Sequence, residues 1–154
     1  MNIAQVMKFD VETCHIDDNL NTIAGKMSKI DIGCLPFVNA SLQVLGMITE
    51  RDICIGAYNQ QKALSDIPVS AVMSRDLFSC HATDTVAKVE ASMRRHKVRR
   101  LPVVNTEGKL VGIVSLDDLA VEAERKLGSR NHDITAQEVI ATLASVHHPS
   151  KRNE

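Results

Sequence analysis

The chain repeats itself, and this repeat limits its possible folds more than any other feature of the sequence. When the sequence is shifted by 66 positions, residues 6–53 align with residues 72–119 without a gap, and 13 of the 48 aligned positions are identical. Many of the remaining pairs exchange similar residues, as Ile23 and Val89 do. Two copies are too few for a solenoid, in which at least three repeats bury one another's faces. The sequence therefore predicts a closed pair of similar units.

Each copy begins with the signals of a short extended segment and a helix. The segments 11–15 and 77–81 precede helix starts that we expect at Asp17 and Asp18, or at Thr83 and Asp84. Apolar residues then recur at helical spacing and predict one buried helical stripe in each copy. These stripes are Leu20, Ile23, Met27 and Ile30 in the first copy, and Val86, Val89 and Met93 in the second.

The second half of each copy predicts a hairpin and another helix. Short apolar runs at 35–38 and 44–48 flank a turn, and the runs at 101–104 and 110–114 do the same around the letters NTEG. The next helix is expected to open at Thr49 or Ser115, and Gly128 is placed to end the later one. The predicted unit is strand, helix, strand, strand, helix, and it occurs in both copies.

Composition excludes several classes of protein. The chain has 18 Lys and Arg against 19 Asp and Glu, so its formal net charge of -1 argues against a basic nucleic-acid binder. Aromatic residues make up 3%, which leaves few rings on which bases could stack. We see no signal peptide and no apolar run of membrane-spanning length, so a soluble, cytoplasmic protein without a membrane partner is expected. In that compartment the cysteines Cys14, Cys34, Cys54 and Cys80 are expected to be buried thiols.

Beyond its periodicity, the duplicated sequence resembles a tandem pair of CBS domains. The segments GMITERD (46–52) and GIVSLDD (112–118) each follow a strand of the pattern Leu-Pro-hydrophobic-Val-Asn, and VM introduces each copy. The resemblance implies a first repeat at 1–60, a linker at 61–71, a second repeat at 72–128 and a C-terminal extension with one helix at 129–154. It also implies an α+β fold with two β-α-β-β-α subdomains related by pseudo-twofold symmetry, clefts between the repeats that hold adenine nucleotides, and a homodimer.

The repeated pattern that ends in Asp52 or Asp118 has two compatible interpretations. By itself, Thr49 or Ser115 followed three positions later by an acidic residue is a helix capping box. A helix N-terminus also favours a phosphate group, because it presents unpaired N–H groups and the positive end of the helix dipole. In the family that the sequence resembles, the Asp holds a ribose and the Ser or Thr lies near the phosphate.

The same resemblance implies further ligand contacts. The leading segments of the copies would line the purine pockets, through Thr13 and Cys14 and through Ser79, Cys80 and His81. Arg100 would contact a phosphate, for which guanidinium geometry is well suited, and Arg99 could assist it. The first copy has Gly33 and Cys34 at these positions, and only Arg51 is nearby as a substitute. We therefore predict unequal sites, with the second site tighter for phosphorylated ligands.

Two other functions compete with nucleotide sensing. The repeated pairs Cys14-His15 and Cys80-His81 could supply four nitrogen and sulfur ligands to zinc, although adjacent residues are not the usual zinc spacing. The module could also bind no ligand and act as a dimerisation or docking scaffold. No nucleophile elbow or phosphate-binding loop is visible, so we expect neither an enzyme nor a resident cofactor.

The expected function is thus a stand-alone regulatory module whose ligand is AMP or ATP and whose partner is an unidentified regulated protein. ADP, S-adenosylmethionine or a dinucleotide would present the same adenosyl group. The C-terminal segment is expected to add a helix at 136–146. Its start has the signals of a hydrophobic staple around a capping box, at Ile134, Thr135, Glu138 and Val139. Its apolar stripe would be Val139, Ile140, Leu143 and Val146.

Overall fold

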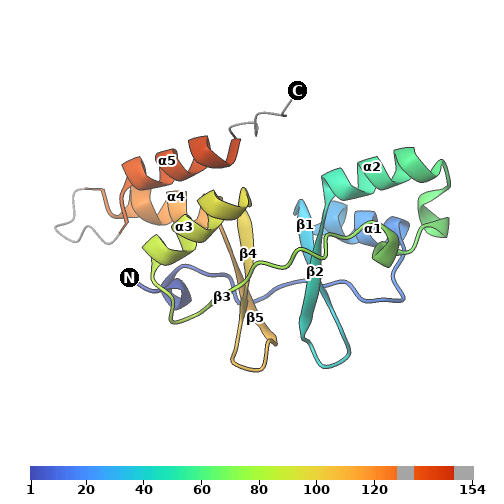
Figure 1. Ribbon diagram of the computed structural model, residues 1–154, viewed down its shortest axis with the longest axis horizontal. Helices are drawn as coiled ribbons and strands as arrows, with labels where there is room; N and C mark the ends of the chain where they lie inside the picture. The colour runs from blue at the N-terminus through green and yellow to red at the C-terminus, as the bar shows by residue number, and fades with distance from the viewer. Residues whose placement is uncertain (128–133, 148–154) are drawn as a thin grey trace. The chain divides into compact units, whose positions relative to one another are not determined.

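The computed structural model describes residues 1–127 and 134–147 and confirms the mixed α+β fold (Figure 1). The chain divides into two compact units. Unit 1 contains Met1–Phe9, Phe78–Asn105 and Val111–Glu154, and unit 2 contains Asp10–Leu77 and Thr106–Leu110. No helix within the described residues is long and apolar enough to cross a membrane. Gly128, the expected end of a helix, lies outside the described residues.

Unit 2 is built on a hairpin covered by helices. Its elements are α1 (Leu20–Ile30), β1 (Cys34–Val38), β2 (Val44–Thr49), α2 (Glu50–Gln60), and the short 3-10 helices η2 (Leu64–Asp66) and η3 (Val69–Ala71). Strands β1 and β2 pair antiparallel, and the leading segment adds a parallel bridge from Cys14 to Phe37. The expected stripe residues Leu20, Ile23 and Met27 are buried, but Ile30 is 40% exposed, so that part of the prediction was wrong. Ile30 is the last residue of α1, beyond the part of the helix that covers the core.

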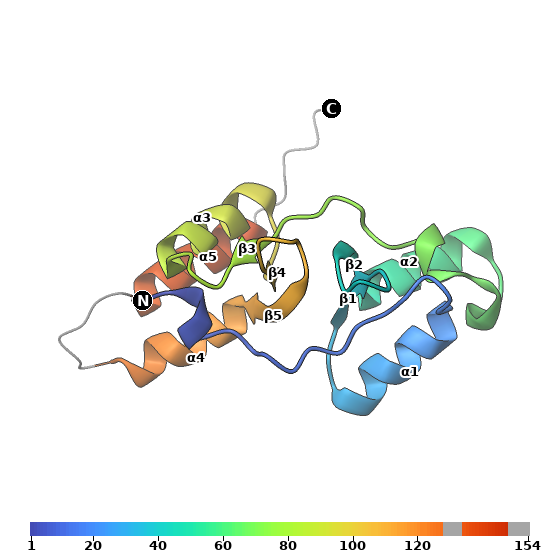
Figure 2. The ribbon, with the colours of Figure 1, turned by 90° about the horizontal axis from the view of Figure 1, so that it is seen from below.

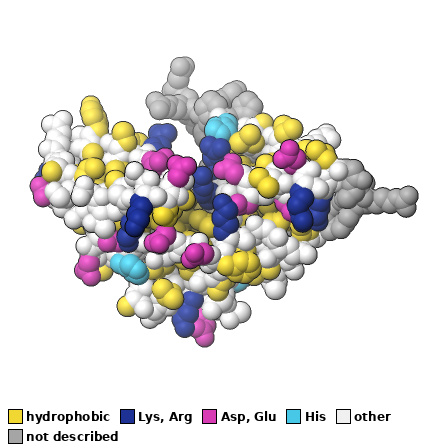
Figure 3. Space-filling model, turned by 180° about the vertical axis from the view of Figure 1, so that it is seen from behind, with side chains coloured by type: hydrophobic (Ala, Val, Ile, Leu, Met, Phe, Trp, Pro, Cys, Tyr) yellow, Lys and Arg dark blue, Asp and Glu magenta, His cyan; other side chains and the backbone are white. Residues whose placement is uncertain are grey.

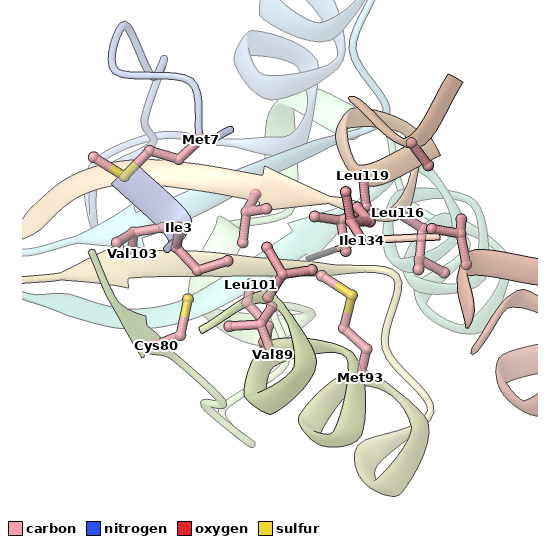
Figure 4. Close-up of a cluster of buried hydrophobic side chains, with 14 residues drawn as sticks. Ile3, Met7, Cys80, Val89, Met93, Leu101, Val103, Leu116, Leu119 and Ile134 are labelled. Carbon is pink, nitrogen blue, oxygen red and sulfur yellow. The ribbon is translucent and has the colours of Figure 1, made fainter. Parts of the chain in front are cut away.

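Unit 1 repeats this arrangement and adds a helix. Its elements are η1 (Ile3–Gln5), β3 (Cys80–His81), α3 (Val86–His96), β4 (Arg100–Val104), β5 (Leu110–Ser115), α4 (Leu116–Arg125) and α5 (Ala136–His147). The sheet order is β3-β4-β5, and β3 runs parallel to β4. Helix α5 lies against α3 and α4, as Figures 1 and 2 show. Figure 4 shows the core, in which Val89 and Met93 of α3 meet Leu101 of β4.

The first helix of each copy starts later than the sequence suggested. Asn19 and Thr85 are the N-caps, and their side chains accept N–H bonds from Thr22 and Lys88. The expected starts at Asp17, Asp18, Thr83 and Asp84 were therefore wrong. Asp18 and Asp84 instead accept the backbone N–H groups of His15 and His81, each at 2.9 Å. Their carboxylates stabilise the turn before the helix, a role that short acidic side chains commonly take.

The leading segment of each copy packs in the unit that is formed mainly by the other copy. The Ile3 N–H donates to the Asp84 carbonyl at 2.9 Å, and both Ile3 and Met7 are buried in the core of unit 1 (Figure 4). In unit 2 the corresponding place is taken by the chain after η2, where the Val69 N–H donates to the Asp18 carbonyl at 3.1 Å. The packing units therefore do not follow the repeat boundaries in the sequence.

Helix α5 confirms the expected capping box and ends one position later than expected, at His147. The Thr135 N–H donates to Glu138 Oε2 at 3.1 Å, and the Glu138 N–H donates to Thr135 Oγ1 at 3.2 Å. Val139 is buried as expected, but Ile140 is 65% and Leu143 38% exposed, so the predicted stripe was partly wrong. Thr142 is fully buried instead, because its hydroxyl bonds to the Glu138 carbonyl and receives a bond from Arg94.

Candidate functional site

The turn from β2 into α2 forms the centre of the candidate site in unit 2. Thr49 is the N-cap of α2, and its N–H and hydroxyl donate to Oδ2 of Asp52 at 2.8 and 2.7 Å. The Asp52 N–H donates back to Thr49 Oγ1 at 3.2 Å. The expected capping box is therefore confirmed, and it engages only one carboxylate oxygen of Asp52.

Unit 1 contains the same turn between β5 and α4. The Ser115 N–H and hydroxyl donate to Oδ2 of Asp118 at 2.8 and 2.5 Å, and the Asp118 N–H donates to Ser115 Oγ at 3.1 Å. Ser115 is buried, and the side chain of Asp118 is 11% exposed. A carboxylate fixed in this way is oriented before any ligand arrives, which lowers the entropic cost of binding.

A glycine before each turn lets a neighbouring segment approach closely. A Cβ atom on Gly46 would lie 2.4 Å from the Ser74 carbonyl oxygen, and one on Gly112 would lie 2.8 Å from the Lys8 carbonyl oxygen. Lys8 exchanges backbone hydrogen bonds of 2.9 Å with Ile113 in each direction. Ser74 makes the same paired contact with the strand in unit 2. Each turn is therefore flanked by a segment that its own repeat does not supply.

Lys8 is a candidate site residue that the sequence analysis missed. Its Nζ lies 3.2 Å from Oδ1 of Asp118, the oxygen that the capping box does not use. Nothing in the sequence pattern signals this pair, because Lys8 lies near the start of the first copy whereas Asp118 is the last residue of the second copy's motif. Only the packing of Met1–Phe9 in unit 1 brings the two side chains together.

The predicted phosphate cations differ in their surroundings. Arg100 begins β4, and its guanidinium lies 3.6 Å from Oδ2 of Asp117 in the first turn of α4. The Arg99 side chain is exposed, and its carbonyl accepts the Leu116 N–H. In unit 2 the space beside Gly33 is taken by Glu50, whose Oε2 would lie 3.0 Å from a Cβ there. A carboxylate thus stands in unit 2 where unit 1 has the Arg99 side chain.

Cys34, the counterpart of Arg100, is buried in unit 2. Arg51, the only nearby cation predicted there, is exposed in the first turn of α2. The two turns therefore carry the charge difference that the sequence predicted.

The residues expected to line the purine pockets are divided between core and surface. Thr13 is half-buried, and its carbonyl accepts a bond from Lys26 Nζ at 3.1 Å. Ser79, just before β3, and His81, the last residue of β3, are both exposed, and His81 Nδ1 lies 3.0 Å from the Val104 carbonyl. Cys14 and Cys80 are buried in the cores of their units. Their side chains face the protein interior, so a ligand could meet only the backbone at these two positions.

The cysteines offer little to a metal. Burial raises the pKa of the Cys14 thiol and of the Cys80 thiol to about 12 in each case, and the nearby Asp18 and Asp84 carboxylates add to this effect. Zinc is bound by the thiolate, so coordination would require these buried thiols to lose their protons. Among residues 1–127 and 134–147, no group of three or more His, Cys, Asp and Glu side chains is placed to hold a metal ion. Cys54 is exposed, so the expectation that it is a buried thiol was wrong.

A pocket of about 240 Å³ lies along α2 beside Asp52. Its lining combines the apolar residues Ile55, Gly56 and Val72 with the polar residues Asp52 and Asn59. Pockets that enclose a drug-sized ligand have volumes of roughly 300–1,000 Å³, so this one is smaller than those.

Figure 3 shows side chains of both charges on one face of the molecule. On that face, Lys and Arg side chains are interspersed with Asp and Glu side chains. A mixed pattern of this kind does not follow a phosphate backbone, which is bound by a stripe or patch of positive charge. The mixture of positive and negative side chains agrees with the formal net charge of -1.

Comparison with known proteins supports the resemblance seen in the sequence. The profile of the family described as CBS domain matches residues 3–55 and 69–124. The CBS domain-containing protein YhcV of Bacillus subtilis (strain 168) is 31% identical over 140 residues, which cover 90% of this chain and 98% of that protein.

Solved structures agree with the sequence comparison. The CBS domain pair of protein MJ0100, in complex with 5′-methylthioadenosine and S-adenosyl-L-methionine, is similar with a TM-score of 0.74 at 25% identity, over 82% of this chain and 98% of that chain. Hypoxic Response Protein I with two coordinated zinc ions is similar with a TM-score of 0.72 at 27% identity, over 79% of this chain and 98% of that chain.

Proposed function

The chain belongs to the CBS domain family, and on that premise we propose that it is a regulatory module that binds an adenosyl ligand and transmits the occupancy of its sites. The observation that carries this proposal is the duplicated turn from strand into helix. Each turn holds an oriented Asp carboxylate at the N-terminus of a helix of at least ten residues.

The chemistry of these turns suits a ribose with a charged substituent. The capping box engages Oδ2 of Asp52 or Asp118, so Oδ1 is the oxygen placed to accept hydrogen bonds from ribose hydroxyls. The positive end of the helix dipole favours an anion beside the same turn. Hydrogen bonds to a charged acceptor are also among the stronger ones in proteins. The same few residues can therefore hold both parts of an adenine nucleotide.

A solved relative supports the adenosyl part of the proposal. The CBS domain pair of protein MJ0100 binds 5′-methylthioadenosine and S-adenosyl-L-methionine, and both ligands contain adenosine. Since the folds match over 82% of this chain, we propose the same ligand class here.

The finer points of the proposal concern the ligand and its consequences. We propose AMP or ATP as the ligand, with tighter binding at the second-copy turn because Arg100 lies at the start of β4. The module would be cytoplasmic and non-catalytic, would form a homodimer, and would signal to a regulated protein. Regulation of this kind requires that the ligand bind one arrangement of the protein more tightly than another.

A thermal-shift panel followed by calorimetry tests the proposal. AMP, ADP, ATP, S-adenosylmethionine and 5′-methylthioadenosine are added to the full chain, because a ligand that binds only the native state must raise its apparent stability. We expect at least one of them to stabilise the protein, and Asp118→Asn to weaken that ligand about tenfold or more at one site. Asp17→Asn, which changes an exposed carboxylate outside the turns, is the matched control.

The contrary result is equally clear. If no adenosyl compound stabilises the chain at millimolar concentration, the adenosyl-sensing proposal is wrong and the module is a docking scaffold. If binding persists unchanged in both Asp52→Asn and Asp118→Asn, the ligand lies elsewhere and the assigned turns are wrong.

A further inference from the structure

The ion pair between Lys8 and Asp118 gives the second-copy turn a cation of its own. Lys8 Nζ lies 3.2 Å from Oδ1 of Asp118, while Oδ2 of the same carboxylate is held by Ser115. Both oxygens of Asp118 are thus engaged, one by the helix cap and one by the ammonium group. The Lys8 side chain is 71% exposed and that of Asp118 is 11% exposed, so the pair lies at the surface with its ammonium end accessible.

The backbone holds Lys8 at this position. Its N–H and carbonyl exchange hydrogen bonds of 2.9 Å with Ile113 in β5, and Gly112 allows this close approach because a Cβ there would lie 2.8 Å from the Lys8 carbonyl oxygen. The side chain therefore starts from a fixed point beside the turn. Only its flexible four-carbon stem is free to move.

The first-copy turn has the same backbone arrangement without the charge. Ser74 pairs with Met47 through hydrogen bonds of 3.1 and 2.9 Å, as Lys8 pairs with Ile113. The residue that flanks Asp52 at this place is thus a neutral serine, whereas the residue that flanks Asp118 is a lysine. Since the backbone contacts of the two turns match, the lysine adds a positive charge beside Asp118 that the first-copy turn does not have at this place.

We infer that Lys8 is a charge-selecting residue of the second-copy site, which makes this site prefer adenosyl ligands with an anionic 5′ substituent to neutral or cationic ones. The inference rests on the proposed function, because it assumes that Asp118 accepts the ribose hydroxyls. A ribose that binds Oδ1 displaces the ammonium of Lys8 from its partner. A phosphate on the same ligand replaces the lost negative charge, whereas a methylthio group does not and a sulfonium group adds repulsion.

Calorimetry with AMP and 5′-methylthioadenosine tests this inference, because the two probes share adenosine and differ in charge at the 5′ position. The full chain, Lys8→Gln and Lys88→Gln are compared in an Asp52→Asn background, in which the first-copy carboxylate is neutral. Lys88 is the matched control, since it is an exposed lysine of the same unit that pairs with a different carboxylate, that of Asp84, at 2.6 Å.

We expect Lys8→Gln to lower the ratio of AMP affinity to 5′-methylthioadenosine affinity about two- to fivefold, the range typical of an exposed charge contact. Lys88→Gln should leave this ratio unchanged. The effect of Lys8→Gln should also shrink as salt is raised, because added ions screen exposed charges.

The inference fails under each of the following results. If Lys8→Gln changes the affinity of neither probe, the ammonium does not sense the ligand, and if Lys88→Gln changes the affinity ratio as much as Lys8→Gln does, only the overall charge matters. Equal weakening of both probes by Lys8→Gln shows that Lys8 merely positions Asp118. If neither probe binds the Asp52→Asn protein, in which Lys8 is intact, but both bind the unsubstituted chain, the second-copy site does not exist. If neither probe binds the unsubstituted chain, the proposed function itself fails.

Discussion

Replacing Glu90 by glutamine should make the protein more stable at neutral pH. Glu90 lies on α3 facing α5, is 2% exposed, and its Oε1 has no hydrogen-bond partner among the residues that the structure describes. Burial raises the pKa of Glu90 above its ordinary value of 4.5, and the negative charge of Glu138 on α5 raises it further. Arg94 and the Thr142 hydroxyl oppose this shift but do not cancel it.

The size and the pH dependence of the effect follow from this environment. A buried acceptor without a partner costs about 1–3 kcal/mol, more when it is charged. Because the pKa of Glu90 is higher in the folded state, that state binds more protons than the unfolded state at pH values above 4.5. The stability of the unmodified protein therefore falls as the pH rises from 4.5 through the folded-state pKa, and stays low above it. Glu90→Gln removes this loss.

Urea unfolding followed by circular dichroism between pH 4.5 and pH 8 measures the effect. We expect Glu90→Gln to gain about 1–2 kcal/mol at pH 7, or roughly 2–8 °C in Tm, and to gain little near pH 4.5. Glu124→Gln, a change to an exposed carboxylate on α4, should alter stability by less than about 0.5 kcal/mol. A gain that is absent at pH 7, or is the same at every pH, would refute the reasoning.

Two further predictions concern glycine packing and cysteine reactivity. Gly46→Ala should destabilise the protein by about 1–3 kcal/mol in urea, because its Cβ would lie 2.4 Å from a backbone carbonyl oxygen. Gly25→Ala, in α1 with open space around it, should instead stabilise by about 0.5–1 kcal/mol, and equal effects of the two changes would contradict the packing argument. In the native protein at pH 7, a maleimide should modify exposed Cys54 well before Cys14 or Cys80, whose pKa values are about 12. Mass spectrometry that finds Cys14 or Cys80 labelled as fast as Cys54 would show that their burial is misjudged.

The sequence predicts those parts of the fold that depend on local pattern. The capping boxes at Thr49 and Ser115 could be foreseen because a cap needs only two side chains three positions apart. The buried stripes follow from helical spacing for the same reason. Exposure within these stripes could not be foreseen, and Ile30 at the end of α1 and Ile140 inside α5 are exposed although they continue a periodic pattern. Whether a periodic residue is buried depends on what packs against it, which spacing alone does not reveal.

The candidate site was predictable only in part, because its neighbours come from distant sequence. Asp118 and Ser115 lie on one turn and could be paired by inspection. Lys8 could not, because backbone hydrogen bonds bring it beside β5 and these bonds place no demand on side-chain type. The gapless alignment even argued against the pair, since it assigns Lys8 to the first copy.

The leading segment of each copy packs with the other copy, and this affects how the protein folds during synthesis and how it can be divided into fragments. Ile3 and Met7 leave the ribosome before the second copy, yet their buried positions in unit 1 are not available until that copy has been made. Contacts between such distant parts of a chain form slowly, because a large loop must close first. A fragment that contains only the first copy would carry the apolar residues Ile3 and Met7 without the core in which they pack. Neither packing unit is therefore one continuous half of the sequence.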